Sequence, residues 1–160
     1  MRFRVGDKVV YPHHGAAVIE GLEEKELLGE KREYYILKLA YGDLTLMVPT
    51  DACEEVGLRE VTPAKDMPKV IKVLKKQEPI TNTTNWSRRF KANVEKLRSG
   101  DIYQVAEVVR SLHQRDRSKG LSAGEKRMLT KARQILVSEL TFSKNCNEEE
   151  AEKLLDEVLG

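Results

Sequence analysis

Apolar and polar residues alternate over the first 61 residues, in short runs separated by residues that favour turns. Tyr35, Leu37 and Leu39, for example, fall on one side of such a run. Short strands that recur about every ten residues predict a small, strongly bent antiparallel sheet or barrel. The expected turns lie at Gly6-Asp7, at residues 12–15, at Gly29 and at Gly42-Asp43.

The run just before Pro49 gives the clearest prediction of side-chain direction. In a strand, successive side chains point to opposite faces of the sheet. We therefore expect Leu44, Leu46 and Val48 to point into the core, and Thr45 and Met47 to point outward.

From Thr62 onward the apolar spacing changes to three and four residues, which is typical of amphipathic helices. Start and stop signals divide this half of the chain into about five helices, with a loop expected at residues 77–84 between the first and the second. The chain is therefore predicted to be an α+β protein of two domains, with a small antiparallel sheet over 1–61 and an all-α bundle over 62–160. The expected helix starts are Pro68, Trp86 with Asn85 as N-cap, Asp101, Ser122 in a capping box with Glu125, and Asn147 with Glu150.

Charge is distributed unevenly, although the net charge of the 160 residues is only +2. Residues 86–135 carry 13 Lys or Arg and 5 Asp or Glu, whereas the segments on either side are acidic on balance. There are too few local acids to pair with these cations, so the excess indicates a surface that binds a polyanion.

The overall composition favours a cytoplasmic protein. With 40% hydrophobic and 34% charged residues, the chain can bury a core and stay in solution. No apolar run approaches the length of a membrane span, and the first residues lack a signal-peptide core. Cys53 and Cys146 are isolated in different halves, so no disulfide framework is predicted.

Motifs for catalysis, metal binding or cofactor binding are not found in the sequence. There is no phosphate-cradling Gly-rich loop followed by Lys-Ser/Thr, no nucleophile elbow and no HExxH. His13-His14 follows Pro12, and adjacent side chains on an extended segment point apart, so we interpret both as turn or packing residues. We predict that the protein is not an enzyme and needs no metal or cofactor.

The stretch from Asn85 to Lys91 holds the only tryptophan, followed closely by three cations. At the start of a helix, Trp86 and Arg89 share a face, and the helix offers free backbone N–H groups. Such a helix start suits DNA, since cations bind phosphates and a ring can press on an opened base step. The alternative is that Trp86 is a core residue beside a solvated basic surface.

A second cationic helix start is expected at Ser122, where Lys126 and Arg127 follow the capping box. The helix dipole and the backbone N–H groups both attract phosphate there. A capping box explains Ser122 and Glu125 by itself, but it does not explain why two cationic helix starts occur in one bundle.

Four motifs, taken together, closely resemble the bacterial CarD family of transcription regulators, and the resemblance covers essentially the whole chain. It implies an N-terminal Tudor-like domain that docks on the β subunit of RNA polymerase. It also implies a helical domain that contacts promoter DNA at the upstream edge of the bubble and stabilises the open complex. The motifs are residues 11–15 (YPHHG), 42–45 (GDLT), 85–91 (NWSRRFK) and 120–129 (GLSAGEKRML).

The resemblance also implies roles for individual residues. Trp86 corresponds to the minor-groove wedge of the family, and Arg88, Lys91 and Lys126 correspond to DNA-backbone contacts. Arg89 and Arg127 lie beside these residues, and we include both in the expected DNA-binding set.

Lys25 lies where relatives place a basic residue against the polymerase. Met47 departs from the pattern, because many relatives carry arginine there. The expected state is a monomer that associates with the nucleoid through polymerase.

Two other functions fit parts of the sequence. A polymerase-independent, nonspecific DNA-packaging protein would need only residues 86–135. A peptide-reading Tudor-like module would need Tyr11, Tyr34, Tyr35 and Tyr41 to form an aromatic cage. The alternation places Tyr34 and Tyr35 on opposite faces, which argues against a shared cage.

Overall fold

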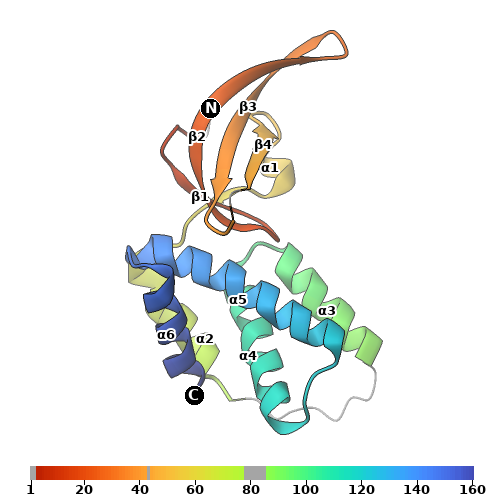
Figure 1. Ribbon diagram of the computed structural model, residues 1–160, viewed down its shortest axis with the longest axis vertical. Helices are drawn as coiled ribbons and strands as arrows, with labels where there is room; N and C mark the ends of the chain where they lie inside the picture. Colours follow the sequence, from red (N-terminus) through yellow and green to blue (C-terminus); the bar gives the residue numbers. More distant parts are fainter. Residues whose placement is uncertain (1–2, 43, 78–85) are drawn as a thin grey trace.

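The computed structural model describes residues 3–42, 44–77 and 86–160. A small sheet formed by the N-terminal part lies above a bundle of helices (Figure 1). The expected loop at 77–84 and the expected N-cap Asn85 lie outside the described residues, apart from Gln77. The described elements confirm the predicted α+β organisation, with a small antiparallel sheet followed by helices. The boundary at residue 62 stays a prediction.

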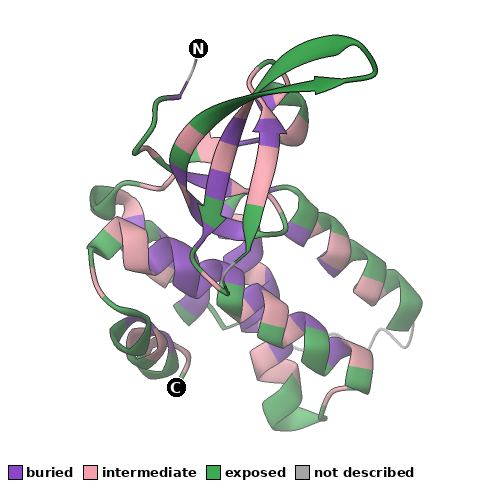
Figure 2. Ribbon diagram, turned by 45° about the horizontal axis from the view of Figure 1, so that its top comes forward, coloured by how far each residue is buried: buried purple, intermediate pink, exposed green. Residues whose placement is uncertain are grey.

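All neighbouring strands in the five-stranded sheet are antiparallel, as predicted, in the order β4-β3-β2-β1-β5. β2 and β3 form a long hairpin that turns at Leu28 and Gly29, both with positive φ. The hairpin extends beyond the rest of the sheet, and its outer half is exposed (Figure 2). The strands are β1 Lys8–Tyr11, β2 Gly15–Leu27, β3 Glu30–Leu39, β4 Thr45–Pro49 and β5 Arg59–Glu60.

The expectation for Leu44 was wrong, whereas the rest of that run behaves as predicted. Leu44 precedes β4 and is 61% exposed. Its carbonyl accepts a hydrogen bond from the backbone of Leu39, so it belongs to the turn and not to the alternating strand. Val48 is buried and Leu46 packs against the core. Met47 pairs with Ile36, on the outer face of the sheet.

One element of the first 61 residues is a helix, although the sequence pattern indicated only strands. Helix α1 covers Cys53–Val56 and ends at Gly57, whose φ of 78° caps it in the left-handed conformation. A helix of four residues is too short to show a helical spacing of apolar positions. It returns the chain to β5, which pairs with β1.

The helical domain follows the predicted starts closely. Asp101 accepts a hydrogen bond from the N–H of Tyr103, and both predicted capping boxes are formed, at Ser122 and at Asn147. None of the helices in the described ranges combines the length and the apolar character needed to cross a bilayer. The helices are α2 Met67–Lys75, α3 Trp86–Arg98, α4 Ile102–Ser118, α5 Ala123–Lys144 and α6 Glu148–Leu159, and a short 3₁₀ turn at Ala64–Asp66 precedes α2.

Each domain has its own apolar core. Tyr35 and Leu37 are completely buried in the sheet domain, where the Tyr35 hydroxyl donates to the backbone carbonyl of Phe3. In the helical domain, α4 and α5 supply most of the core, with Leu112 and Leu136 each 1% exposed. Because the two cores are separate, neither of them by itself holds the two domains together.

The turn at residues 12–15 packs directly against the helical domain. Gly15 has a φ of 96°, and a Cβ placed on it would lie 2.7 Å from Ser138 Oγ on α5. The next residue, Ala16, donates its backbone N–H to the same Ser138 oxygen at 2.9 Å. A Cβ on Gly100 would lie 2.9 Å from Pro12. The Tyr-Pro-His-His-Gly motif is therefore one of the parts of the sheet domain that pack against the helices.

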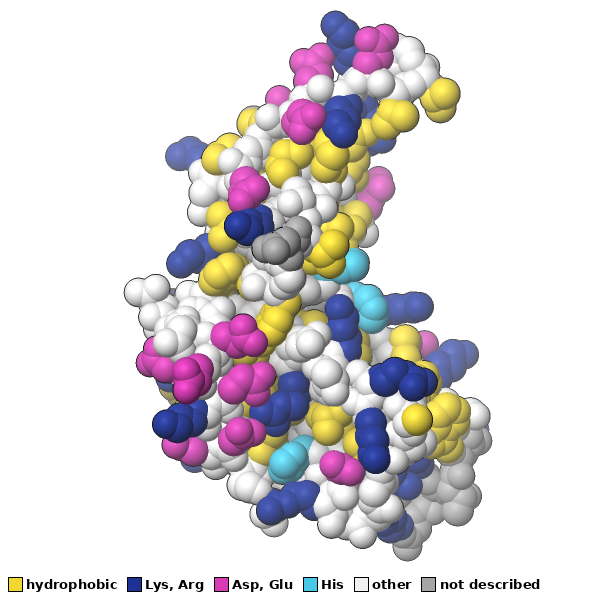
Figure 3. Space-filling model, viewed as in Figure 1, with side chains coloured by type: hydrophobic (Ala, Val, Ile, Leu, Met, Phe, Trp, Pro, Cys, Tyr) yellow, Lys and Arg dark blue, Asp and Glu magenta, His cyan; other side chains and the backbone are white. Residues whose placement is uncertain are grey.

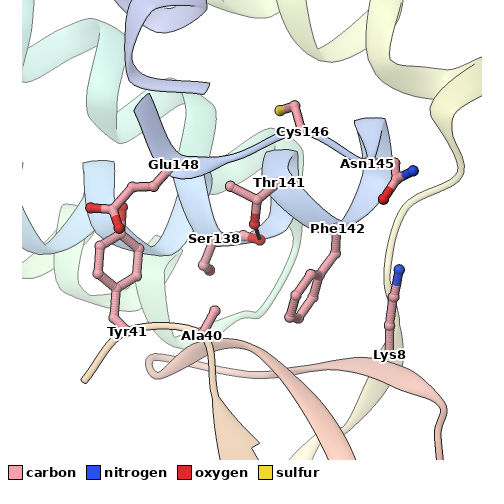
Figure 4. Close-up of a pocket in the computed structure, with 9 residues that line it drawn as sticks. All are labelled: Lys8, Ala40, Tyr41, Ser138, Thr141, Phe142, Asn145, Cys146 and Glu148. Atoms are coloured by element: carbon pink, nitrogen blue, oxygen red, sulfur yellow. Dashed lines mark hydrogen bonds between the residues drawn. The ribbon is translucent and has the colours of Figure 1, made fainter. Parts of the chain in front are cut away.

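A cavity of about 360 Å³ remains at one side of this junction (Figure 4). Lys8 lies over the ring of Phe142, 5.5 Å from its centroid. Burial, together with the carboxylates of Glu148 and Glu152, raises the pKa of Tyr41 above its ordinary value. Residues of both domains therefore line this space, which lies away from the starts of α3 and α5.

Candidate nucleic-acid interface and docking face

Trp86 stands in the first turn of α3, at the edge of the helical core. Its ring stacks on Phe90 with a centroid distance of 4.9 Å and an interplanar angle of 21°. The indole N–H donates to Ser122 Oγ at 3.2 Å. The residue is nevertheless 42% exposed. Each of the two alternatives for Trp86 therefore fits part of the structure. One side of the ring packs on the helical core, and the other side faces solvent.

The starts of α3 and α5 are held together at this place. Ser122 caps α5 and also receives the Trp86 hydrogen bond. Arg89 reaches across to Glu125, with 3.5 Å between guanidinium nitrogen and carboxylate oxygen. The Arg89 side chain is only 20% exposed, so it connects the two helices at the margin of the surface. The two cationic helix starts predicted from the sequence therefore form one site.

The remaining expected DNA-binding residues are exposed around Trp86. Arg88 and Lys91 lie on α3, and Lys126 and Arg127 lie on α5. Within the described part of the chain, no carboxylate lies within ion-pair distance of Lys91, Lys126 or Arg127. Figure 3 shows basic side chains over the α3 and α5 side of the helical domain and acidic ones on the side of α6. The geometry thus combines an apolar ring, cations and two helix N-termini.

Replacing Lys91 or Lys126 with Ala should weaken duplex binding about equally across sequences. Each loss should reduce the slope of log K against log salt by roughly one unit, because phosphate contacts release counterions. Titrations of duplex DNA at several salt concentrations measure this slope. Lys153→Ala on α6 is the control, and it should leave the slope unchanged. An unchanged slope in the Lys91 and Lys126 variants would contradict phosphate contact.

Glu125 holds the two helix starts in place through its charge. Burial alone would raise the pKa of this carboxyl, but hydrogen bonds from Ser122 and the nearby Arg89 lower it below 4.5. A carboxyl with a lowered pKa stabilises the fold above its unfolded pKa. That contribution is lost as the pH falls through the lower folded-state value.

Glu125→Gln should therefore lower the stability at pH 7 by about 1–2 kcal/mol, because Gln keeps the capping hydrogen bond but loses its charge-assisted strength and the contact with Arg89. The difference from the unaltered protein should shrink as the pH falls below about 4.5. Thermal melting between pH 3 and pH 7 measures it. Glu150→Gln, in the exposed capping box of α6, should cost less. A difference that stays constant with pH would contradict the role of the Glu125 charge.

Lys25 and Met47 share the outer face of the sheet. Lys25 pairs with Arg32, and Met47 pairs with Ile36. Arg32 and Ile36 are four residues apart on β3, so they point to the same side, opposite the buried Tyr35 and Leu37. The structure thus places the two residues expected to contact polymerase on one face, in rows four residues apart along β3.

A β-bulge places Lys25 on that face. The register of β2 shifts between Ile19 and Gly21, so β2 advances two residues while β3 advances one. Ile19 points into the core, and strict alternation from it would carry Lys25 inward as well. The bulge reverses the alternation of β2, as extra residues in bulges do.

Half-buried apolar side chains lie between Lys25 and Met47. Tyr34 pairs with Pro49 in the row between them, and Ile36 lies beside Met47. We call this set, with Arg32 and Lys25 at one end, the outer sheet face. It offers an apolar centre with charged side chains at its edge, where Arg32 forms an ion pair with Asp51, an arrangement expected of a protein–protein contact.

Histidines and acidic residues do not form a metal site in the part of the chain described. No group of three His, Cys, Asp or Glu residues is placed to hold an ion there. His13 and His14 are exposed in the turn before β2, where His13 has a φ of 72°. Burial, and then the charge of Lys131, lower the pKa of both imidazoles. They are turn residues, as predicted.

Four residues of these surfaces were not predicted from the sequence to belong to a site. Phe90 and Ser122 support Trp86, and Tyr34 and Ile36 occupy the outer sheet face. The spacing of Trp86 and Phe90, four residues apart on a helix, was a signal that their rings could meet. The position of Ser122 beside Trp86 had no signal in the sequence.

Comparison with protein families covers both domains. Residues 3–62 match the CarD-like/TRCF RID domain, and residues 69–156 match the CarD C-terminal domain. The chain belongs to the CarD family. The family places it among transcription regulators linked to RNA polymerase.

A bacterial relative agrees with this assignment. The chain is 37% identical over 148 residues to YdeB, a candidate transcription factor of Bacillus subtilis (strain 168). That match spans 92% of this CarD-family chain and 96% of YdeB. The solution structure of the 72-residue N-terminal domain of Myxococcus xanthus CarD is 29% identical. It covers 36% of this chain and 77% of that domain, with a TM-score of 0.32.

Proposed function

We propose that this CarD-family protein docks on the β subunit of RNA polymerase and stabilises the open promoter complex. The outer sheet face, with Lys25 and Met47, makes the polymerase contact. The paired starts of α3 and α5 contact promoter DNA at the upstream edge of the bubble. Arg88, Lys91, Lys126 and Arg127 bind backbone phosphates there, and Trp86 presses on the opened base step.

The observation that carries this proposal is the state of Trp86. A large aromatic ring that is 42% exposed is uncommon in a folded domain. Its stack on Phe90 and its hydrogen bond to Ser122 hold the ring in one orientation before any ligand arrives. A pre-organised apolar ring among cations suits a minor-groove wedge, which needs phosphate contacts on each side.

Stabilisation of the open complex follows from a difference in affinity. A ligand shifts an equilibrium only as far as it prefers one state over the other. Phosphate contacts are similar on closed and melted DNA, but a ring can stack only where a base step has opened. Docking on polymerase raises the local concentration of the helical domain at the bubble, so a weak stacking contact suffices.

Arg89 has a different part in this arrangement from its neighbours. Its contact with Glu125 and its low exposure favour a role in holding α3 against α5. We propose that it supports the shape of the DNA-binding site and approaches phosphate only at the margin.

A footprint of polymerase on one promoter, with and without this protein, tests the proposal. We expect added protection at the upstream edge of the bubble and a longer-lived open complex. A nonspecific DNA-packaging protein would instead protect DNA without polymerase. A pull-down with RNA polymerase β subunit separates these two functions.

The peptide-reading alternative has little support in the structure. Tyr35 is fully buried, and its hydroxyl is engaged with the backbone of Phe3. Tyr34 lies on the opposite, outer face. These two rings therefore do not line a common cage.

Met47→Arg should accelerate association with an isolated polymerase β fragment if the partner surface there is acidic. Position 47 lies at the end of the outer sheet face away from Lys25 and Arg32, four residues along the sheet. Added charge at a contact chiefly alters the association rate, and the gain should fade as salt increases. Stopped-flow or biosensor kinetics at low and high salt measure it.

Lys153→Arg is a control that changes no contact. A slower rate, or a gain that salt does not reduce, would mean that the partner is adapted to methionine.

A further inference from the structure

Arg59 and Glu139 form an ion pair between the two domains. Arg59 lies on β5, and its two terminal nitrogens donate to the two carboxylate oxygens of Glu139 on α5, at 2.8 and 2.7 Å. The Glu139 side chain is 2% exposed, whereas that of Arg59 is 27% exposed. A bidentate arrangement of this kind fixes the direction of both planar groups as well as their distance.

Two further hydrogen bonds extend the pair to other segments. The Arg59 Nε–H donates to the carbonyl of Gly100, in the turn between α3 and α4, at 2.6 Å. The backbone N–H of Thr62, which leads from β5 to the helices, donates to Glu139 at 2.8 Å. We call this set, Arg59, Glu139, Gly100 and Thr62, the interdomain lock. It connects the last strand, the linker, the α3–α4 turn and α5.

Stability alone does not account for a buried ion pair. Removing two charged groups from water costs about as much as their attraction returns, and apolar replacements are often equally stable. The lock instead fixes the orientation of the two domains relative to each other, because an apolar contact would allow them to slide and rotate. The adjacent contacts of the turn at Gly15 with Ser138 act at the same part of α5.

α5 transmits this orientation to the candidate DNA site. Glu139 lies in the second half of the helix, and Ser122, which holds Trp86, caps its start. Seventeen residues separate them, which is about 25 Å along an α-helix. Because α5 is one continuous helix (Figure 1), the lock at its second half and the Trp86 contact at its start belong to the same rigid element.

We propose that Arg59 and Glu139 are positioning residues that make the two domains one rigid unit. Docking of the outer sheet face then fixes where Trp86 stands against the DNA. This proposal rests on the proposed function and adds that the angle between the domains is part of it. A flexible connection would also tether the helical domain to polymerase. The helical domain would then have to be oriented anew each time it bound the DNA, which costs binding free energy.

The variant that tests this is the double replacement Arg59→Met with Glu139→Leu in the full chain. It leaves no unpaired charge at the junction, so both domains should stay folded. Glu139→Gln is the second variant, since it keeps the shape and removes the charge. Arg133→Met is the matched control. Arg133 also contacts carboxylates at 2.8 Å, but those are Glu152 and Asp156 on α6, within one domain.

Residual dipolar couplings in a weakly aligned sample report the angle between the domains directly. In the unaltered protein and in Arg133→Met, both domains should give the same alignment tensor. In the two lock variants the tensors should differ in magnitude or direction. A common tensor in both lock variants, or different tensors in the unaltered protein, would overturn the proposal.

The functional measurement uses complete RNA polymerase and one promoter. In the double variant, docking on polymerase and duplex binding should change less than about twofold, because neither surface is altered. The gain in open-complex lifetime should fall by about tenfold, as expected when a pre-organised contact has to be ordered during binding. An unchanged lifetime gain, or a loss of docking or duplex binding, would overturn it.

Failure of the proposed function itself would look different. In that case the unaltered protein would not lengthen the open-complex lifetime, or it would do so equally well in Trp86→Ala. The alignment tensors would still report whether Arg59 and Glu139 fix the domain angle.

Discussion

Trp86→Ala should shorten the lifetime of the open promoter complex by about tenfold, because stacking of a base on an aromatic ring is worth about 1–3 kcal/mol. Docking through the outer sheet face should survive. Weak duplex binding through Lys91 and Lys126 should mostly survive as well. The free energy of unfolding should fall by about 1–2 kcal/mol, from loss of the Phe90 stack and the Ser122 hydrogen bond. Open-complex lifetime and thermal melting, measured together, check this.

Trp86→Phe is the matched control for this experiment. It keeps a flat ring that can stack on Phe90 and loses the indole N–H that binds Ser122. It should retain most of the lifetime gain. The wedge would be ruled out by a normal lifetime in well-folded Trp86→Ala. It would also be ruled out by a loss of about 3–5 kcal/mol, the cost of removing a core aromatic, with all activities falling together.

Gly15→Ala should destabilise the protein by about 2–4 kcal/mol, the largest loss of stability that we expect from a single added methyl group. The φ of 96° is strained for any residue with a side chain. The added Cβ would also lie 2.7 Å from Ser138 Oγ and 3.5 Å from the Ile135 backbone. Overpacking against a helix adds about 1–3 kcal/mol to the strain. Denaturant unfolding measures the sum.

Gly29→Ala separates the two contributions. Gly29 has a φ of 81° at the tip of the hairpin, and nothing lies within 4 Å of a Cβ placed there. It should therefore cost only the backbone strain, about 1 kcal/mol. If Gly15→Ala cost no more than Gly29→Ala, the turn at residues 12–15 would not be packed tightly on α5.

Local signals in the sequence predicted the helix starts well, because a single side chain is enough to cap a helix. Asp101, Ser122 and Asn147 cap helices because their side chains accept backbone hydrogen bonds two or three residues on. Such bonds depend on neighbours in the chain and not on the tertiary fold. The closeness of Trp86 and Phe90 is local in the same sense.

Features that depend on residues distant in the chain could not be predicted. Arg59 and Glu139 are 80 residues apart, and each alone has the appearance of a surface charge. The position of Ser122 against Trp86 depends on how α3 packs beside α5. Leu44 was placed inside because alternation alone does not show where a strand starts. The polymerase and DNA roles of the site residues stay predictions.

The β-bulge after Ile19 also limits how this hairpin can change in length during evolution. Lys25 stands on the same face as Met47 only because one extra residue reverses the alternation of β2. An insertion or deletion of one residue between Gly21 and Lys25 would turn Lys25 toward the opposite face, whereas a change of two would keep it. Natural variants with a longer or shorter hairpin should therefore differ by even numbers of residues in this segment, if the outer sheet face is what selection preserves.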